Sequence, residues 1–473
     1  MKILIYNTLS GKKEEFKPIK AGHLSFYYCG PTVYSVQHIG NLRGSFCADI
    51  IHRTFKYLNY DVSMVRNYTD VGHLTSDADE GEDKIEKTAK KENISPELVA
   101  DKFISIFERD SKKLNILEPK FKPRATENID EMIDMVQLLI AKGYAYVTDL
   151  AVYFDVDKFK DYSALSGCKI EKNKMGAGRG DVSDPKKKNY CDFALWFFKA
   201  GVHRNALQFW PSPFVSPLVE KGYGFPGWHI ECSAMIRKIL GNTIDIHMGG
   251  IEHVSIHHSN EIAQSESVSG VKLANYWIHN EHLLINNGKM SKSQGSAFSL
   301  EDIENKGFNS ISLRYFFLQA NYRSKQNFTF EALKAAQKGL TIIYNKIKKL
   351  ETVIGEVNVD FKNKFLDYLL DNFNTPKTLS LISEILKSDL SNEDKLATLL
   401  DFDNIWALDF AKIINNDEKD TSLSDDIKKL LADREEARKN KDFTKADKVR
   451  IEIEKLGYKI EDLPDGRGIA VKI

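Results

Sequence analysis

Hydrophobic and polar positions over the first ~120 residues alternate between the period of strands and the period of helices. Residues 24–28 form a short aromatic-rich run that ends at Cys29-Gly30-Pro31, which predicts a buried strand. Apolar residues at helical spacing over 41–60 predict a helix, and residues 61–65 predict the next strand. Strand, loop, helix and strand make a βαβ unit, which predicts a parallel sheet with ligands outside the carboxyl ends of its strands.

The rest of the chain divides by changes in this pattern. Residues 121–225 interrupt the α/β alternation and are expected to form an insertion, after which the alternation resumes over 226–285. A polar, glycine-containing region follows at 286–325, and the periodicity from 326 to 473 is almost wholly helical. The predicted fold is therefore α/β: a Rossmann-like parallel-sheet domain over 1–120 and 226–285, carrying an insertion and followed by an α-helical C-terminal region.

Composition and charge narrow the class of protein. The chain has 473 residues with 67 basic and 67 acidic side chains, so a polyanion partner must be held by local patches rather than by a basic whole. No run approaches the ~20 apolar residues of a membrane span, and the N-terminus lacks the features of a signal peptide. Five scattered cysteines, an odd number, indicate reduced thiols. We expect a cytoplasmic protein with no membrane association.

Candidate metal ligands come from three places in the chain. Cys29 ends the first predicted strand, Cys232 falls near the start of a predicted helix, and histidines concentrate between 229 and 282. His257 and Glu261 are four apart on a predicted helix and share a face, whereas His258 is expected to point elsewhere. Two Cys, one His and one Glu would give Zn²⁺ a four-coordinate site. From spacing alone, buried thiols and a surface His–Glu pair remain open as the alternative.

Candidate phosphate-binding residues lie in two loops. His38 to Asn41 stands where a strand ends and a helix begins, so unpaired backbone N–H groups and the positive end of the helix dipole are available there. Gly40 permits close approach of a ligand, and His38 and Asn41 can both donate hydrogen bonds. The loop at 286–295 carries Lys289 and Lys292, which could neutralise a phosphate chain. The alternatives are an ordinary polar loop and a solvated turn.

Taken together, these motifs resemble those of class I aminoacyl-tRNA synthetases, and within that class those of the cysteinyl-tRNA synthetase family. His38-Ile39-Gly40-Asn41 is similar to the HIGH signature, and residues 289–293 read KMSKS. The stretches GWHIECSAM, HHSNEIAQSE, LRYFFLQANYRS and DREEARKNKDFTKADKVR also resemble the family. The matching stretches run from residue 6 to residue 450, so the likeness covers nearly the whole chain.

The resemblance implies a zinc-dependent ligase that activates cysteine with ATP and transfers it to tRNA(Cys) during protein synthesis. It implies one Zn²⁺ per chain, and the implied ligands are Cys29, Cys232, His257 and Glu261. A metal that accepts a thiolate more readily than a hydroxyl would separate cysteine from serine without an editing domain. The resemblance also implies that Trp228 and Thr69 bind the amino acid.

The same resemblance assigns the nucleotide site, with Mg²⁺ accompanying ATP. His38 and Asn41 would hold the phosphates, and Lys289 and Lys292 would stabilise the pyrophosphate charge. The adenosine would be bound by Gly40, Gly249, Gly250 and Glu252, and Lys292 would also contact ATP. Glu252 is a departure, because the family usually has Asp there. The remaining assignments are 121–225 as connective insertion, 286–325 as KMSKS loop and stem-contact region, and 326–473 as anticodon-binding region of a monomer.

Three alternatives differ from this interpretation in testable features. A related ligase attaches cysteine to an amino sugar but lacks an anticodon-binding domain, whereas this chain continues into the 433–450 motif. A non-catalytic tRNA-binding relative would have lost signature residues, yet both loops and all four candidate ligands are present. A purely structural zinc protein would have no use for the lysines at 289 and 292.

Overall fold

The computed structural model describes residues 2–72, 74–76, 80–167, 184–289, 297–350, 353–415, 425–440, 442–462 and 468–472. The chain forms two compact units, Met1–Leu408 and Asp409–Ile473. Lys292 and the other residues of 290–296 lie outside the described residues, as does the side chain of Lys289. In the described part, no helix is both long enough and apolar enough to cross a membrane.

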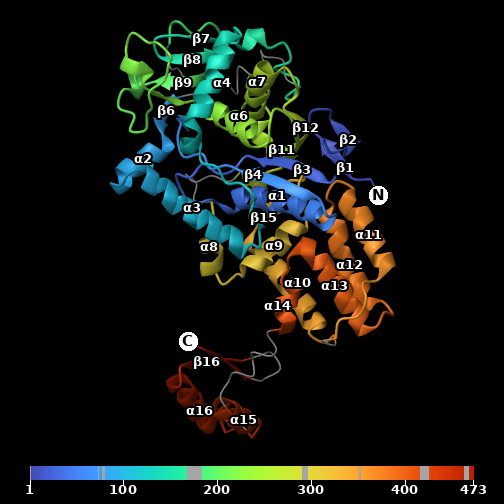
Figure 1. Ribbon diagram of the computed structural model, residues 1–473. Helices are drawn as coiled ribbons and strands as arrows, with labels where there is room; N and C mark the ends of the chain where they lie inside the picture. Colours follow the sequence, from blue (N-terminus) through green and yellow to red (C-terminus); the bar gives the residue numbers. More distant parts are fainter. Residues whose placement is uncertain are drawn as a thin grey trace. The chain divides into compact units, whose positions relative to one another are not determined.

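A four-stranded parallel sheet forms the centre of the first unit, in the order β12-β11-β3-β4 (Figure 1). Its strands are β3 (His23–Tyr28), β4 (Asp61–Arg66), β11 (Ile244–Gly250) and β12 (Ala274–Asn280). Nearly every position of each strand is buried, which is typical of a parallel sheet covered on both faces. The predicted Rossmann-like parallel sheet is confirmed.

Three helices connect the strands and position the site. α1 (Ile39–Tyr57) links β3 to β4, α6 (Trp228–Ile239) leads into β11, and α7 (His257–Ser269) links β11 to β12. α1 begins within two residues of the predicted helix start and is followed by β4 as predicted. Because the strands are parallel, the starts of α1 and α7 lie at the same edge of the sheet. This edge is where the candidate residues gather.

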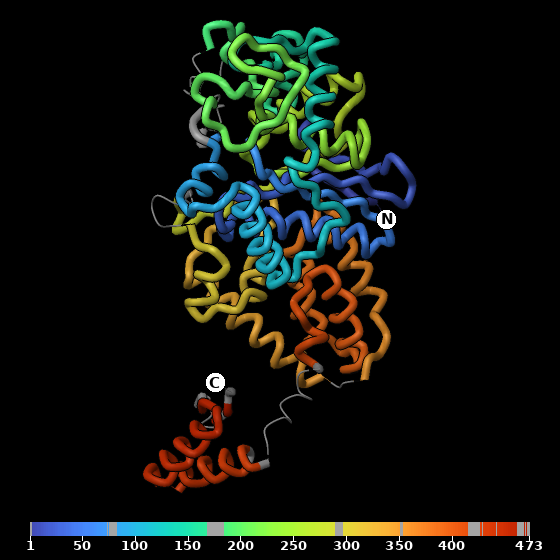
Figure 2. Tube along the Cα trace, turned by 60° about the vertical axis from the view of Figure 1, so that its left-hand side comes forward, coloured from blue at the N-terminus to red at the C-terminus, as the bar shows by residue number. Residues whose placement is uncertain are grey.

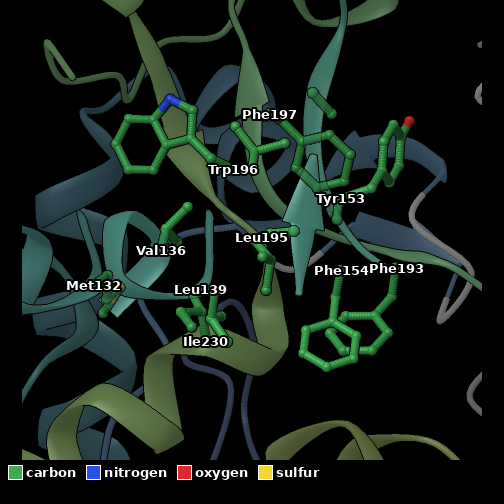
Figure 3. Close-up of a cluster of buried hydrophobic side chains, with 14 of the residues drawn as sticks. Met132, Val136, Leu139, Tyr153, Phe154, Phe193, Leu195, Trp196, Phe197 and Ile230 are labelled. Atoms are coloured by element: carbon green, nitrogen blue, oxygen red, sulfur yellow. The ribbon is translucent and has the colours of Figure 1, made fainter. Parts of the chain in front are cut away.

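The insertion folds as an antiparallel sheet of its own, in the order β10-β9-β8-β7. The strands are β7 (Ala145–Val147), β8 (Ala151–Phe154), β9 (Phe193–Phe198) and β10 (Gly224–Pro226), and α4 (Ile129–Ala141) packs beside them. Figure 3 shows the core, in which Met132, Val136 and Leu139 of α4 meet Leu195 of β9 and Ile230 of α6. The rings of Phe154 and Phe193 stack with centroids 5.0 Å apart. This shared core anchors α6, and therefore the candidate ligand Cys232.

Other elements of the first unit flank the sheet and continue into a helical region, shown in orange in Figures 1 and 2. The flanking elements are β1 (Leu4–Asn7), β2 (Lys12–Glu15), β5 (Leu74–Ser76), β6 (Glu80–Asp83), α2 (Lys84–Glu92) and α3 (Pro96–Lys113). After β12 come β13 (Leu283–Ile285), β14 (Gly288–Lys289), α8 (Leu300–Asn305), α9 (Ser310–Leu318), β15 (Gln326–Phe328), α10 (Phe330–Ile347), α11 (Val359–Leu370), α12 (Thr375–Lys387) and α13 (Asn392–Trp406). The expected helical region is confirmed here.

The second unit contains helices and one hairpin. Its helices are α14 (Phe410–Asn415), α15 (Asp425–Lys439) and α16 (Phe443–Lys455), and β16 (Tyr458–Asp462) pairs antiparallel with β17 (Gly468–Lys472). Val449 and Ile453 of α16 form a small core with Ile460 of β16. The periodicity from 326 to 473 indicated an almost wholly helical region, and it did not show this hairpin.

Candidate active site

A cavity of about 420 Å³ opens at the carboxyl edge of the parallel sheet. One end is walled by Cys29, Thr69, Trp228, Cys232 and His257, and the other by the start of α1 and the segment that follows β12. The cavity therefore joins the two groups of residues that the sequence singled out separately, the candidate metal ligands and the candidate phosphate-binding residues.

The four candidate metal ligands converge at one end of this cavity. The donor atoms of Cys29, Cys232, His257 and Glu261 all lie within 4.8 Å of one another, and all four side chains are buried. Cys29 directly follows β3, and its backbone N–H donates to the carbonyl of Met248 on β11 at 3.0 Å. Cys232 lies on the second turn of α6, and His257 and Glu261 lie one turn apart on α7. The sheet and two helices thus fix the cluster.

The carboxyl group of Glu261 and the imidazole of His257 have pKa values that are shifted in opposite directions. Burial alone would raise the pKa of Glu261, but the nearby His247 and His257 outweigh it and hold that pKa well below its usual range. Burial likewise opposes charge on His257, yet Glu261 and Cys232 raise the pKa of this imidazole to about 10. Its Nε2 lies 3.0 Å from Oε1 of Glu261. The anionic donors therefore hold a positive charge next to them.

The pKa values of the two thiols, Cys29 and Cys232, are also shifted in opposite directions. A hydrogen bond from Cys29 lowers the pKa of Cys232 to about 6, against the effect of burial and with help from His257. Burial raises the pKa of Cys29 well above its usual value, and Cys232 and Glu261 raise it further. One thiolate is thus stabilised even without a metal, and a cation between the sulfurs would favour the second.

Further histidines surround the cluster, and sequence reasoning assigned them no role. Nε2 of His258 lies 3.4 Å from Sγ of Cys29, so His258 does not point away as expected. His247 contacts Oε2 of Glu261 at 2.8 Å, and His258, His247, Cys29 and Glu261 form a second group of donors that could hold a metal. Nδ1 of His258 in turn lies 2.7 Å from Nε2 of His279. The concentration of histidines over 229–282 was the only signal for this network.

The candidate substrate contacts flank the cluster. The Trp228 ring stacks on His257 with centroids 4.3 Å apart, and Trp228 is four positions before Cys232 on the same face of α6. Thr69 is buried beyond the end of β4, and its hydroxyl accepts a hydrogen bond from Nδ2 of Asn67 at 3.3 Å. Both residues line the cavity beside the four donors.

The start of α1 forms the opposite end of the cavity. His38 is its N-cap, and Nδ1 accepts from the backbone N–H of Asn41 at 3.2 Å, which places the ring proton on Nε2. The first turn of α1 has no acidic side chain, so the positive end of the helix dipole is not neutralised there. His38, Gly40 and Asn41 all line the cavity. The arrangement suits an anionic ligand.

The two glycines at the end of β11 have different surroundings. Gly250 lines the cavity, and a Cβ at this position would lie 2.3 Å from Oε1 of Glu252. Gly249 is buried behind it, where a Cβ would come within 2.6 Å of Nδ1 of His253. Glu252 lines the cavity and lies 3.7 Å from Nδ1 of His282. Backbone and carboxylate at this edge are therefore available to a ligand.

Comparison with known proteins supplies the context for this geometry. The family model "tRNA synthetases class I (C) catalytic domain" matches residues 15–338, and "Cysteinyl-tRNA ligase anticodon binding domain" matches 420–467. A cysteine–tRNA ligase of Treponema denticola is 39% identical, with 98% of each chain covered. One from Clostridioides difficile is 40% identical over the same share of both chains.

Among solved structures, a Mycobacterium tuberculosis methionyl-tRNA synthetase in complex with methionyl-adenylate resembles this chain with a TM-score of 0.57. The match covers 83% of this chain and 93% of that one at 13% sequence identity. At this level of identity the likeness shows a common fold, that of the class I synthetases.

Proposed function

Because this chain belongs to the cysteinyl-tRNA synthetase family of class I synthetases, we propose that it activates cysteine with ATP and transfers it to tRNA(Cys). In the first step the cysteine carboxylate attacks the α-phosphorus of ATP, which forms cysteinyl-adenylate and releases pyrophosphate. In the second, a hydroxyl of the terminal adenosine of the tRNA attacks the activated carbonyl and AMP leaves. The observation that carries this proposal is one cavity bounded by a thiol-rich donor cluster and by the start of α1.

The chemistry of the donor set supports one zinc ion held by Cys29, Cys232, His257 and Glu261. All four donors are buried within 4.8 Å of one another, and the pKa of Cys232 is already lowered to about 6. Glu261 and Cys232 raise the pKa of His257 to about 10, which supports a cluster that can stabilise a cation. Two sulfurs, one nitrogen and one oxygen are a donor set that suits Zn²⁺.

The protein's own residues then provide the amino acid half of the site. When bound, zinc supplies a Lewis acid that prefers sulfur to hydroxyl oxygen as a ligand, which would separate cysteine from serine. Trp228 forms an apolar wall beside the donors, and Thr69 offers a hydroxyl at the same end of the cavity. We infer that these two residues orient the substrate with its carboxylate toward α1.

The nucleotide half would be formed by α1, the end of β11 and the lysines of the second loop. His38 donates from Nε2 and Asn41 from its amide to the phosphates, beside the positive end of the α1 dipole. We assign the adenosine to Gly40, Gly250 and Glu252. Gly249 lies next to this site, where the absence of a Cβ leaves room for the rings of His253 and His258.

The charge that develops on pyrophosphate is assigned to Lys289 and Lys292 together with Mg²⁺. Phosphoryl transfer of this kind depends mainly on positioning and on electrostatic stabilisation, and these two lysines are the first and fourth residues of the KMSKS motif. The pairing of β13 with β14 places the backbone of Lys289 beside Leu284. We propose Lys292 as a contact of ATP as well.

The assignment of regions follows the same family. We propose residues 121–225 as the connective insertion, 286–325 as the KMSKS loop and stem-contact region, and 326–473 as the anticodon-binding region. The match of an anticodon-binding family to 420–467 supports the last assignment and favours tRNA over an amino sugar as the acceptor. We further propose that the protein acts as a monomer in the cytoplasm.

Cysteine-dependent ATP–pyrophosphate exchange, followed by charging of tRNA(Cys), tests the proposed function. The protein is expected to exchange with cysteine, to exchange far less with serine, and to transfer the activated cysteine to tRNA(Cys). Transfer to an amino sugar in place of tRNA would support the alternative ligase. Exchange with serine at a rate comparable to cysteine would contradict the proposal.

A further inference from the structure

Arg43 is a buried cationic side chain to which the proposed reaction assigns no role. It lies on the second turn of α1, and only 1% of its surface is exposed. Its guanidinium donates to four oxygens: Oε1 of Gln326 at 3.1 Å and the backbone carbonyls of Glu281, Asn321 and Ser324 at 2.5, 3.3 and 3.0 Å. These four partners are uncharged.

A guanidinium in this environment is a costly way to fill space. Burying a charge against neutral acceptors is unfavourable unless the hydrogen bonds repay the lost hydration, and an apolar side chain of similar volume would pack at lower cost. What the guanidinium alone provides is a rigid fork with five N–H donors. Here the fork joins α1 to two separate segments, one at Glu281 and the other at 321–326.

The two segments already form one assembly without Arg43. The N–H of Glu281 donates to the carbonyl of Tyr322 at 2.8 Å, and Leu283 of β13 pairs with Gln326 of β15. Gln326 also donates through Nε2 to the carbonyl of Phe316 at 2.6 Å. The segments at Glu281 and 321–326 are therefore bonded to each other independently of Arg43, and Arg43 connects α1 to both of them.

The segment at 280–283 forms one wall of the cavity. Asn280, Glu281, His282 and Leu283 line it, and His282 lies 3.7 Å from Glu252. The facing wall is α1, at Gly40 and Asn41. The fork thus sets the separation and the orientation of the two walls between which the nucleotide is proposed to bind.

We propose that Arg43 is a positioning residue for ATP, which holds the wall at Asn280–Leu283 in register with the first turn of α1. This inference rests on the proposed function, because it takes the nucleotide as the ligand of this part of the cavity. Arg43 does not touch the metal cluster, so its removal should affect ATP and spare cysteine.

A fully buried arginine on α9, Arg314, offers a matched control. Arg314 is 0% exposed and also joins α1 to distant segments, through Asp49 at 2.7 Å and the carbonyls of Trp406 and Leu114 at 2.6 and 2.8 Å. It does not line the cavity. Arg43 and Arg314 therefore share burial and carbonyl partners but differ in the wall that they support.

The test compares Arg43→Lys, which keeps the charge and loses the fork, with Arg314→Lys and the wild-type chain. Calorimetric titration with a non-hydrolysable ATP analogue gives Kd directly, and cysteine-dependent exchange gives KM for each substrate. Because a wall displaced by even 1 Å weakens positioning strongly, we expect Arg43→Lys to raise Kd and KM for the nucleotide on the order of tenfold. KM for cysteine and the metal content should stay close to wild type, and Gln326→Leu should cause a smaller change in the same direction.

The outcomes separate this inference from the proposed function. Arg314→Lys should lower thermal stability without changing nucleotide affinity. If Arg43→Lys binds the analogue as wild type does, or if both lysine variants lose nucleotide affinity alike, Arg43 has only a structural role and the inference is wrong. The proposed function fails separately, if the wild-type chain binds the nucleotide but catalyses no exchange with cysteine.

Discussion

Asn67 is the residue that connects the metal end of the cavity with the proposed amino acid contact. Its Oδ1 accepts from the backbone N–H of Gly30 at 2.8 Å, directly after Cys29, and its Nδ2 donates to the Thr69 hydroxyl at 3.3 Å. A Cβ on Gly30 would lie 1.8 Å from the carbonyl oxygen of Asn67, so only glycine permits this approach. Asn67 is 1% exposed and its partners hold it in one orientation.

The change Asn67→Asp tests this connection. The variant can still accept from Gly30 but cannot donate to Thr69, so the Thr69 hydroxyl would donate to the new carboxylate and its proton would no longer be available to a substrate. We expect KM for cysteine to rise about tenfold, the effect of one buried hydrogen bond, with metal content unchanged. Exchange kinetics and metal analysis measure both.

Thr69→Val supplies the control for that experiment. If Asn67 acts through the Thr69 hydroxyl, the double variant should be no worse than Thr69→Val alone, because the two residues work as one unit. Additive effects of the two changes would show that Asn67 acts by another route.

At the scale of elements, the parts of the fold with a clear period could be predicted and those set by tertiary packing could not. The β3–α1–β4 unit followed from apolar spacing, and α7 placed His257 and Glu261 together as expected. The orientation of His258 was missed because α7 is buried on nearly all sides, so adjacent residues both meet protein. The β16–β17 hairpin was missed because each strand has only five residues, too few to show a clear period beside the long helices before them.

The site likewise contains residues that sequence motifs could predict and residues that only the folded structure reveals. Sequence motifs brought together Cys29, Cys232, His257 and Glu261, and the structure places their donor atoms within 4.8 Å. Arg43 and Asn67 carry no local signal, because their roles arise from partners distant in the sequence, such as Gln326 for Arg43. A single sequence cannot show such a pair before the chain is folded.

A buried histidine in the turn after β9 makes the stability of the insertion depend on pH. His203 is 8% exposed, packs against the rings of Phe197 and Phe225, and its Nε2 has no hydrogen-bond partner among the described residues. Burial lowers the pKa of His203 from 6.5 to about 4. Between these two values the unfolded chain binds a proton that the folded chain does not, so stability falls as the pH drops from 6.5 to about 4 and is fully present above 6.5.

We therefore expect the free energy of unfolding of His203→Leu to fall less than that of the wild-type chain as the pH drops below 6.5. The loss linked to His203 alone is about 3 kcal/mol over this range, from ~2.5 pKa units at 1.36 kcal/mol each. Urea unfolding at about pH 7.5 and about pH 4.5 measures the change in the free energy of unfolding for both proteins. Equal losses in wild type and variant would show that His203 is not responsible.

At the scale of the whole molecule, the two compact units separate two tasks. Every described residue of the proposed activation site lies in Met1–Leu408, and the match to an anticodon-binding family lies in Asp409–Ile473. The first unit has its own parallel sheet and large core, whereas the second has a small core around Val449, Ile453 and Ile460.

Truncation after Leu408 should therefore separate activation from charging. The shortened chain is expected to retain cysteine-dependent pyrophosphate exchange within about twofold, because the groups that stabilise the transition state remain in place. Charging of tRNA(Cys) should fall by on the order of a hundredfold, as expected when contacts worth a few kcal/mol are lost. Loss of both activities with retained secondary structure would contradict this division.

The central claim is that Cys29, Cys232, His257 and Glu261 hold a metal that meets the thiol of the substrate. The most direct measurement replaces the native metal with Co²⁺ and follows its sulfur-to-metal charge-transfer absorption while cysteine or serine is added. The account predicts one metal per chain, a band that intensifies with cysteine and does not change with serine, and loss of the band in Cys232→Ser. An active chain without metal, or a band that does not respond to cysteine, would contradict it.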